Sequence, residues 1–231
     1  MAPKQSYCRS DERRGYHHGS LKDALIEAAR RLVSERGLAG FTLAEAAKLV
    51  GVTGAAPYRH FADRDALVEE LARRGFEQFG AGLRSAWDGG QPNARTALQR
   101  MGDAYVGFAR AEPGLYAAMF GNVRTLSAPG PGAAATLALD TLKTAAAATL
   151  DEGIGRDKAA RDLAFELWSL SHGVAMLSLG GHLDASDDPA PLDVLHRASG
   201  ALVDAAVRRL RAKQTPPVKA EREGVPDRSP G

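Results

Sequence analysis

The stretch that most limits what this chain can fold into runs from Thr42 to Phe61, with the sequence TLAEAAKLVGVTGAAPYRHF. Thr42 followed three residues later by Glu45 is the capping box of a helix N-terminus. Gly51 is placed to end that helix, because glycine adopts the left-handed conformation of a helix end at little cost. Thr53 can then cap a second helix that ends near Phe61. Two short helices joined by a glycine turn predict a helix-turn-helix, whose second helix usually enters a DNA major groove.

The second of these helices presents one face to the core and one to the outside. At about 100° per residue, Pro57 and Phe61 fall on the core side. The residues that remain for contact with DNA are Thr53, Gly54, Ala55, Ala56, Tyr58, Arg59 and His60. Glycine and alanine let the backbone approach DNA closely, and the three long side chains donate hydrogen bonds to phosphates or base edges. The alternative is a helical hairpin inside a bundle, whose polar face meets only solvent.

Among these donors, Arg59 lies opposite the core side, so we expect it to make a bidentate contact with a guanine. Phosphate contacts, which position a protein without reading sequence, are expected from Thr42, Tyr58, His60 and Arg64. Arg64 directly follows Asp63, the expected cap of a third helix. A cation in a first helical turn opposes the helix dipole unless it meets an anion such as phosphate.

This part of the chain resembles the TetR-type transcriptional regulators. The resemblance rests on four runs, GVT at 51–53, PYRHF at 57–61, FADRDAL at 61–67 and RRGYHHGSLKDALIEAA at 13–29. It covers roughly residues 13–75 and is looser beyond them. The chain departs from the family pattern at Pro57, where the family often has leucine, and at Arg64, where it often has lysine. Pro57 also removes one backbone N–H from a short helix.

The resemblance implies a homodimer that binds a palindromic operator in double-stranded DNA and responds to a small-molecule effector. It also implies that a flexible basic arm, residues 1–14, runs along or into the minor groove with Arg13 and Arg14; a solvated tail is the alternative. We therefore expect a helix-turn-helix DNA-binding domain over residues 15–75. A helical effector-binding and dimerisation domain should follow over 76–213, and a disordered tail over 214–231.

The distribution of charge agrees with this division. Residues 1–75 hold 13 Lys and Arg against 10 Asp and Glu, whereas residues 76–211 hold 13 against 15. The positive excess therefore lies on the side that would meet phosphates. Cys8 is the only cysteine, so neither an intramolecular disulfide nor a thiolate metal cluster can form, and the adjacent His17 and His18 point apart on a helix. We expect no metal and no cofactor.

Two features bear on location. The N-terminus is charged and lacks an apolar segment, which indicates no secretory signal. The run from Leu167 to Leu183 has no charged residue for 17 positions, but its serines and histidines favour a buried helix over a membrane span. We therefore expect a cytoplasmic protein without membrane contact.

Beyond the helix-turn-helix the sequence predicts only helices, so the expected class is all-α. The expected helices cover residues 64–87, 94–111, 114–121, 133–152, 157–180 and 191–213, with a loop over 126–132. The sequence contains no GxSxG, HExxH, P-loop or CxxC signature, and we expect no enzyme. An all-α ligand-binding protein or enzyme with a purely structural helix-turn-helix is the alternative.

In the second domain Trp168, His172 and Gly173 stand out, since positions four apart share one face of a helix. They resemble the W–H–G signature of one C-terminal domain type among TetR-like regulators, and LYAAMFG at 115–121 resembles a second piece of that domain. This resemblance implies an effector cavity near Tyr116, Met119, Phe120, Trp168 and His172. The alternative is a packed core aromatic beside a hydrogen-bonded histidine.

Members of the resembled family form dimers through their last two long helices. Here the last helix carries an apolar stripe of Leu192, Leu195, Ala198, Leu202, Ala206 and Leu210. The helix before it carries Leu163, Leu167, Leu170, Val174 and Leu177. Either stripe fits a dimer face or an ordinary core. The leading hypothesis is a repressor that an effector releases from its operator, and an activator is left open.

Overall fold

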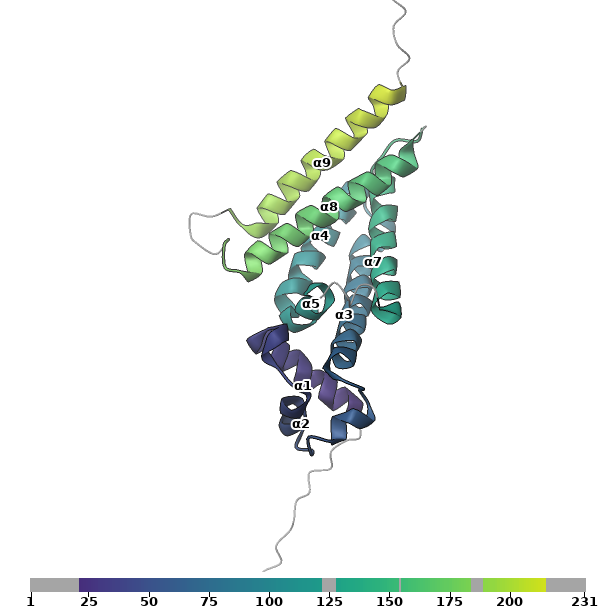
Figure 1. Cartoon of the computed structure of the whole chain (residues 1–231). Coiled ribbons are helices and arrows are strands. Elements are labelled where there is room, and N and C mark those ends of the chain that lie inside the picture. Colours follow the sequence, from purple (N-terminus) through teal and green to yellow (C-terminus); the bar gives the residue numbers. More distant parts are fainter. Residues whose placement is uncertain (1–20, 122–127, 154, 184–188, 215–231) are drawn as a thin grey trace, which may run out of the picture.

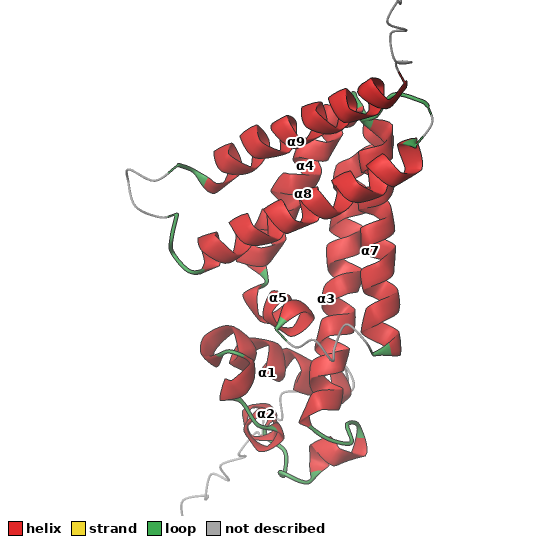
Figure 2. Cartoon of the chain, turned by 45° about the horizontal axis from the view of Figure 1, so that its top comes forward, coloured by secondary structure: helices red, strands yellow, loops and turns green. Residues whose placement is uncertain are grey.

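Helices account for all the regular structure in the part of the chain that is described, residues 21–121, 128–153, 155–183 and 189–214 of this computed structural model (Figure 2). They are α1 (Leu21–Arg36), η1 (Leu38–Gly40), α2 (Leu43–Val50), η2 (Ala56–Arg59), α3 (Arg64–Trp87), η3 (Asp88–Gly90), α4 (Ala94–Ala111), α5 (Pro113–Phe120), α7 (Pro129–Ala148), α8 (Arg156–Leu179) and α9 (Pro191–Gln214). The predicted all-α class is confirmed. No helix within the described ranges has the length and apolar character that crossing a membrane requires.

One end of the molecule is a small unit made of α1, α2, η2 and the start of α3 (Figure 1). Its core gathers the apolar side of each element and includes Leu25, Leu32, Phe41, Phe61 and Leu67. Leu115 and Ala118 of α5 belong to the same core. Burial of one leucine or phenylalanine side chain contributes about 1.5–3 kcal/mol. These contacts therefore hold α2 against α1, and they hold α1 and α3 against α5.

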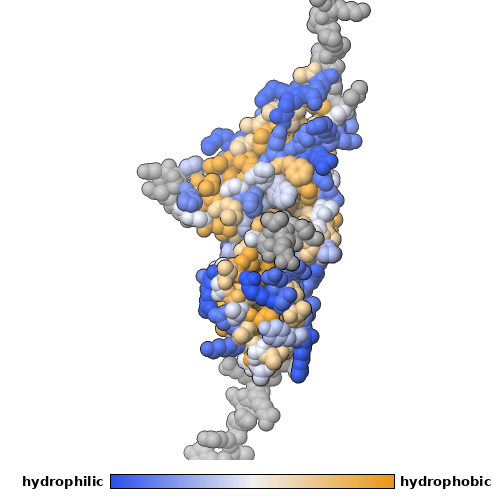
Figure 3. Space-filling model, in the orientation of Figure 1, coloured by the Kyte–Doolittle hydropathy of each residue, from blue (hydrophilic) through white to orange (hydrophobic). Residues whose placement is uncertain are grey.

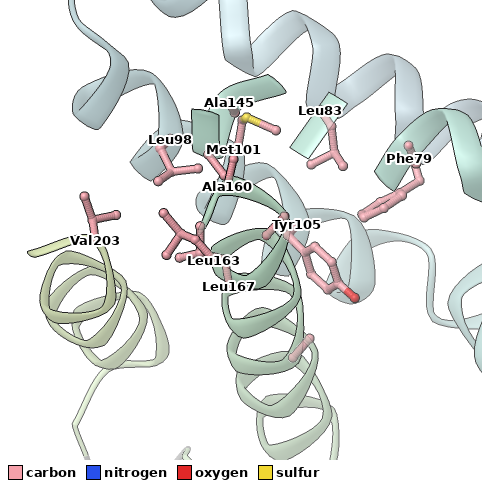
Figure 4. Packing of buried hydrophobic residues seen from close by; sticks show 14 of the residues in the cluster. Phe79, Leu83, Leu98, Met101, Tyr105, Ala145, Ala160, Leu163, Leu167 and Val203 are labelled. Atoms are coloured by element: carbon pink, nitrogen blue, oxygen red, sulfur yellow. The ribbon is translucent and has the colours of Figure 1, made fainter. Parts of the chain in front are cut away.

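Helix α3 connects this unit to the larger helical domain. Its 24 residues, at about 1.5 Å each, span about 36 Å. The first half contributes Leu67 and Leu71 to the N-terminal core, and the second half contributes Phe79 and Leu83 to the second core. Figure 4 shows that second core, to which α4, α7, α8 and α9 also contribute. One straight element is thus buried in both cores.

Helix α7 begins earlier than the sequence predicts. In place of the expected loop over 126–132, α7 starts at Pro129 and takes the whole Pro-Gly-Pro-Gly run into its first turn; residues 126 and 127 lie outside the described part. Proline suits this position because the first N–H groups of a helix have no helical partner. Gly132 already donates its N–H to the Ala128 carbonyl oxygen at 2.9 Å. At its other end α7 stops at Ala148, short of the predicted residue 152.

The apolar stripes of the last two helices face mostly inward. Leu195, Ala206 and Leu210 of α9 are each 2% exposed. On α8, Leu163 and Val174 are buried in the same way. Of the two interpretations that the spacing allowed, ordinary core therefore applies to these five residues.

Candidate nucleic-acid interface and ligand cavity

The first helix of the helix-turn-helix forms as predicted, and Thr42 ties its N-terminus. The Glu45 backbone N–H donates to Thr42 Oγ1 at 3.2 Å, and the Thr42 N–H donates to Glu45 Oε2 at 2.9 Å. Gly51 ends the helix with a φ of 80°, a conformation that side chains disfavour. Thr42 is exposed, so its position at the start of α2 is open to a partner molecule.

The second helix is shorter than predicted. In place of a helix over residues 53–61, the chain forms η2, a four-residue 3-10 helix that no side chain caps, so the predicted cap by Thr53 is wrong. Pro57 supplies the reason, because it has no N–H to donate to the Thr53 carbonyl oxygen. The N–H of Ala56 takes that carbonyl at 3.0 Å instead, which starts a tighter turn. The second element of the helix-turn-helix is thus a single compact turn.

The two predicted faces of this turn are nevertheless present. Pro57 and Phe61 are buried, and Phe61 is only 4% exposed. Tyr58 is 61% exposed. The other exposed positions are Thr53, Gly54, Ala55, Arg59 and His60, while Ala56 is half-buried. The long donors therefore stand on the outer surface of a turn whose remaining side chains are small.

The structure gives Arg64 partners within the protein. Its Nε donates to the Phe41 carbonyl oxygen at 3.1 Å, and a second guanidinium nitrogen donates to the Leu38 carbonyl oxygen. The guanidinium also lies 4.7 Å from the centre of the Phe41 ring, close enough for a cation–π contact. Residues 38–41 lead directly into Thr42 and α2. Arg64 therefore braces the start of α2 against the start of α3.

We predict that Arg64→Lys and Arg64→Ala weaken operator binding alike, without changing its salt dependence. A lysine cannot span two carbonyl oxygens and stack on a ring, as a planar guanidinium does. Each lost hydrogen bond should cost about 0.5–1.5 kcal/mol of folding stability. Salt titrations of binding check this. The phosphate contact expected from the sequence would instead leave Arg64→Lys nearly unaffected, and Arg64→Ala would lower the log–log salt slope by about 0.9.

The basic arm with Arg13 and Arg14 lies outside the described residues. So does the predicted tail, except for Gln214, which is the last residue of α9.

The larger domain contains a partly open cavity of about 240 Å³, lined by residues of α3, α4, α5, α7, α8 and α9. Its wall is mainly aliphatic and aromatic, with Phe79, Met101 and Tyr105 among its residues. Of the five residues predicted to line it, Phe120 and Trp168 do so. The polar groups on the wall are those of Gln99, Tyr105, Thr136, Trp168, Ser171, His196 and Ser199. A compact, largely apolar molecule would fit such a space.

The other three predicted residues lie behind this wall. Met119 is fully buried, and its sulfur packs where Gly75 leaves room for it. Tyr116 is 2% exposed, and its hydroxyl oxygen is 2.7 Å from His172 Nδ1. Sequence reasoning missed Tyr105 and the contributions of α7 and α9. Tyr105 continues the apolar stripe of α4, and α7 carries only small or aliphatic wall residues, so no distinctive residue marked these two helices. On α9 the sequence pointed only to the apolar stripe that includes Leu195, and His196 and Ser199 were not connected with a cavity.

Four side chains, those of Tyr105, Tyr116, Trp168 and His172, join at the cavity wall in one hydrogen-bonded network. The indole N–H of Trp168 donates to Tyr105 Oη at 3.2 Å, and Tyr105 Oη lies 3.3 Å from His172 Nδ1. Burial raises the pKa of Tyr105 to about 12, and it raises the pKa of Tyr116 as well. Burial lowers the pKa of His172. The tyrosines are therefore neutral hydroxyls near pH 7, and burial favours a neutral imidazole.

Helix α5 links the cavity domain to the helix-turn-helix. A Cβ added at Gly114 would overlap the Arg30 carbonyl oxygen of α1. The backbones of α1 and α5 therefore approach each other directly at Gly114, with no side chain between them. Beside this contact, Arg30 Nη1 lies 2.8 Å from Glu112 Oε2. The opposite side of α5 carries Tyr116 and Phe120. The same eight-residue helix thus contacts the DNA-binding unit on one face and the cavity network on the other.

An uncharged strip runs along the outside of α8. This strip, the α8 outer face, consists of Phe165, Ser169, Gly173, Met176 and Leu177. Met176 and Leu177 are 51% and 47% exposed, and nothing lies within 4 Å above Gly173. Hydrophobic surface gathers where α8 ends and α9 begins (Figure 3). Apolar side chains around a glycine suit close helix–helix contact.

An exposed donor-bearing turn at one end and an apolar cavity at the other define a helix-turn-helix transcriptional regulator with a ligand-binding domain. Two family models match the chain, "Bacterial regulatory proteins, tetR family" over residues 25–71 and "Tetracyclin repressor-like, C-terminal domain" over residues 98–202. The chain belongs to the TetR family. The recognition made from the sequence is confirmed.

Solved structures agree. A protein of unknown function from Rhodococcus sp. RHA1 is 31% identical with a TM-score of 0.70, and the match covers 84% of this chain and 99% of that one. The TetR family regulator PfmR from Thermus thermophilus is 17% identical with a TM-score of 0.56, covering 80% and 97%. The fatty acid degradation regulator FadR from Bacillus halodurans is 15% identical with a TM-score of 0.59, covering 82% and 95%. The last two show a shared fold alone. No curated protein matches the chain.

Proposed function

We propose that this TetR-family regulator is a repressor that binds a palindromic operator as a homodimer and is released by a small-molecule effector. The observation that carries the proposal is that α3 and α5 each contribute to the N-terminal core that holds the helix-turn-helix and also to the wall of the cavity. Operator DNA lies in the cytoplasm, so we place the protein there. Its family's domains regulate transcription, so we propose that it acts by binding and not by catalysis.

On DNA, the η2 turn would enter the major groove of each half-site. Two such turns of one dimer must face grooves roughly 34–36 Å apart, or a multiple of that distance. Arg59 is the candidate for reading a base. The residues around Arg59 would allow close approach to the DNA and contact phosphates. Arg13 and Arg14 would form an arm in the minor groove. Because Gly54 and Ala55 offer no hydrogen bond, we expect few base pairs to be read directly.

We propose that effector binding acts through α3 and α5 together. A ligand in the cavity touches Phe79 of α3 and Phe120 of α5, and both helices also enter the N-terminal core. Release from DNA requires that the ligand prefer the arrangement of these helices that fits the operator poorly. The change would then alter the spacing of the two η2 turns in the dimer.

Selection of binding sites from random DNA, followed by salt titration, tests the proposal. We expect a two-fold symmetric site and an affinity that falls steeply with salt. The alternative, a ligand-binding protein or enzyme with a structural helix-turn-helix, predicts no such site. The position of the mapped site relative to its promoter then separates a repressor from an activator.

Arg59→Ala should cost about 1–3 kcal/mol of binding free energy and relax the preference at one base pair in each half-site. The reason is the loss of a bidentate guanine contact. The matched control is Lys48→Ala on the exposed side of α2, for which we expect no change in base preference. Uniform weakening of all sequences by Arg59→Ala would show that Arg59 binds the backbone, and specificity would then come from DNA shape or the arm.

A further inference from the structure

The network of Trp168, Tyr105, Tyr116 and His172 at the cavity wall has one more donor proton than it has well-placed acceptors. Trp168, Tyr105 and Tyr116 bring three N–H or O–H donors together at one place, and the His172 Nδ1 atom is the single nitrogen acceptor. Tyr105 Oη takes the indole proton at 3.2 Å. A neutral imidazole nitrogen has one lone pair. Tyr116 lies closest to it, with its oxygen at 2.7 Å.

The Tyr105 hydroxyl proton is therefore the one without a good acceptor in this network. The Tyr105 hydroxyl oxygen lies 3.3 Å from His172 Nδ1, whose lone pair already accepts the Tyr116 proton. The Tyr116 oxygen is 3.5 Å away, beyond the 2.5–3.0 Å of an O–H···O bond. If His172 carried its proton on Nδ1, that proton would go to a tyrosine oxygen, and the shortage of acceptors would be greater. A buried hydroxyl without an acceptor is costly.

Only one of the two tyrosines lines the cavity wall. Tyr105 does, together with its donor Trp168, whereas Tyr116 lies behind the wall. A molecule in the cavity therefore contacts Tyr105 and Trp168, the two wall residues whose hydrogen bond ends at the Tyr105 hydroxyl. Around it the wall is aliphatic and aromatic, with Phe79 at 4.9 Å from the Tyr105 ring centre to centre.

We propose that the effector is a small, neutral, mainly apolar molecule with a carbonyl oxygen that accepts the Tyr105 hydroxyl proton. This inference rests on the proposed function, in which the cavity binds the effector. At about 240 Å³ the cavity is near the lower end of ligand pockets, about 300 Å³, which suits a one- or two-ring ketone, lactone or quinone. The raised pKa of Tyr105 supports its part, because the phenol stays protonated and donates.

The test compares 1-tetralone with tetralin, which have the same two-ring skeleton and differ by the carbonyl oxygen. Calorimetric titration of the full-length protein should show about 2- to 10-fold tighter binding of the ketone, the gain of one neutral hydrogen bond. Tyr105→Phe should abolish that preference, so that the ketone binds no more tightly than tetralin. Tyr116→Phe frees His172 Nδ1 to accept the Tyr105 proton, so it should also reduce the preference, although Tyr116 does not touch the cavity.

Each remaining outcome contradicts the inference in a different way. Equal binding of both probes to the wild-type protein would overturn the carbonyl preference and leave the cavity as a ligand site. A preference that survives Tyr105→Phe would assign the carbonyl contact to another wall residue. Failure of both probes to bind would overturn this inference together with the proposed role of the cavity, whereas operator binding would remain as the independent test of DNA recognition.

Discussion

Replacing Met176 with glutamate should convert the protein into a monomer and lower its operator affinity by about 10²–10⁴-fold. In a two-fold dimer each chain presents the same surface to its copy, so one substitution places two like charges in the interface. Met176 is the most exposed large hydrophobic residue of the uncharged α8 outer face. A monomer holds one half-site only and loses the gain from binding two. Analytical ultracentrifugation and operator binding at micromolar concentration measure both effects.

Leu137→Glu is the matched control. Leu137 of α7 is 55% exposed, close to the exposure of Met176, but it lies on another helix. We expect it to leave the sedimentation coefficient and DNA affinity unchanged. If Met176→Glu remains a dimer, the α8 outer face is not the interface. If the wild-type protein is itself a monomer and binds its site at full affinity, the proposed homodimer is wrong.

Gly114→Ala should reduce the free energy of unfolding by about 1–3 kcal/mol, the usual cost of forcing extra volume into a packed contact. The new methyl group would overlap the Arg30 carbonyl oxygen and crowd Ser34. Because the obstacle is backbone, α1 and α5 must separate. Denaturant unfolding measures the loss, and we expect the separation also to weaken operator binding by displacing the helix-turn-helix.

The same substitution at Gly107 should have the opposite sign. Gly107 is exposed within α4, with nothing within 4 Å of an added Cβ. Alanine there should stabilise the protein by about 0.5–1 kcal/mol, because glycine is unfavourable in a helix interior. Equal effects at both positions would show that Gly114 is an ordinary helical glycine and that α5 is not closely fitted to α1.

The parts of the fold that local chemistry determines were predicted well. The capping box of α2, its glycine end and the Asp63 cap of α3 all form as expected, since each depends on a few neighbouring residues. The recognition helix was predicted too long, because the helical spacing of Pro57 and Phe61 suits a tight turn as well as a longer helix. The loss of a single N–H at Pro57 decided between them.

The cavity could be predicted only in part, because it depends on tertiary packing. Phe120 and Trp168 were found through a motif, but whether a core aromatic faces a void or a neighbour is set by helices far apart in sequence. Tyr105 is an example, since its role follows from Trp168 and His172, more than 60 positions away. The apolar stripe of α9 could not be assigned from the sequence either. Its spacing fitted a dimer face as well as a core, and in the structure most of it packs in the chain's own core.

The place of α5 in the N-terminal core also limits how this regulator can be recombined with its relatives. A chimera that joins a foreign sensing half at residue 75 would remove Leu115 and Ala118 from the core around Phe41 and Leu67. The unit that must be exchanged to move the DNA-binding domain intact is therefore discontinuous along the chain. It consists of the first helices and of residues 113–121. Exchanges that carry both pieces together keep that core complete, and they transfer operator choice without exposing its apolar side chains to water.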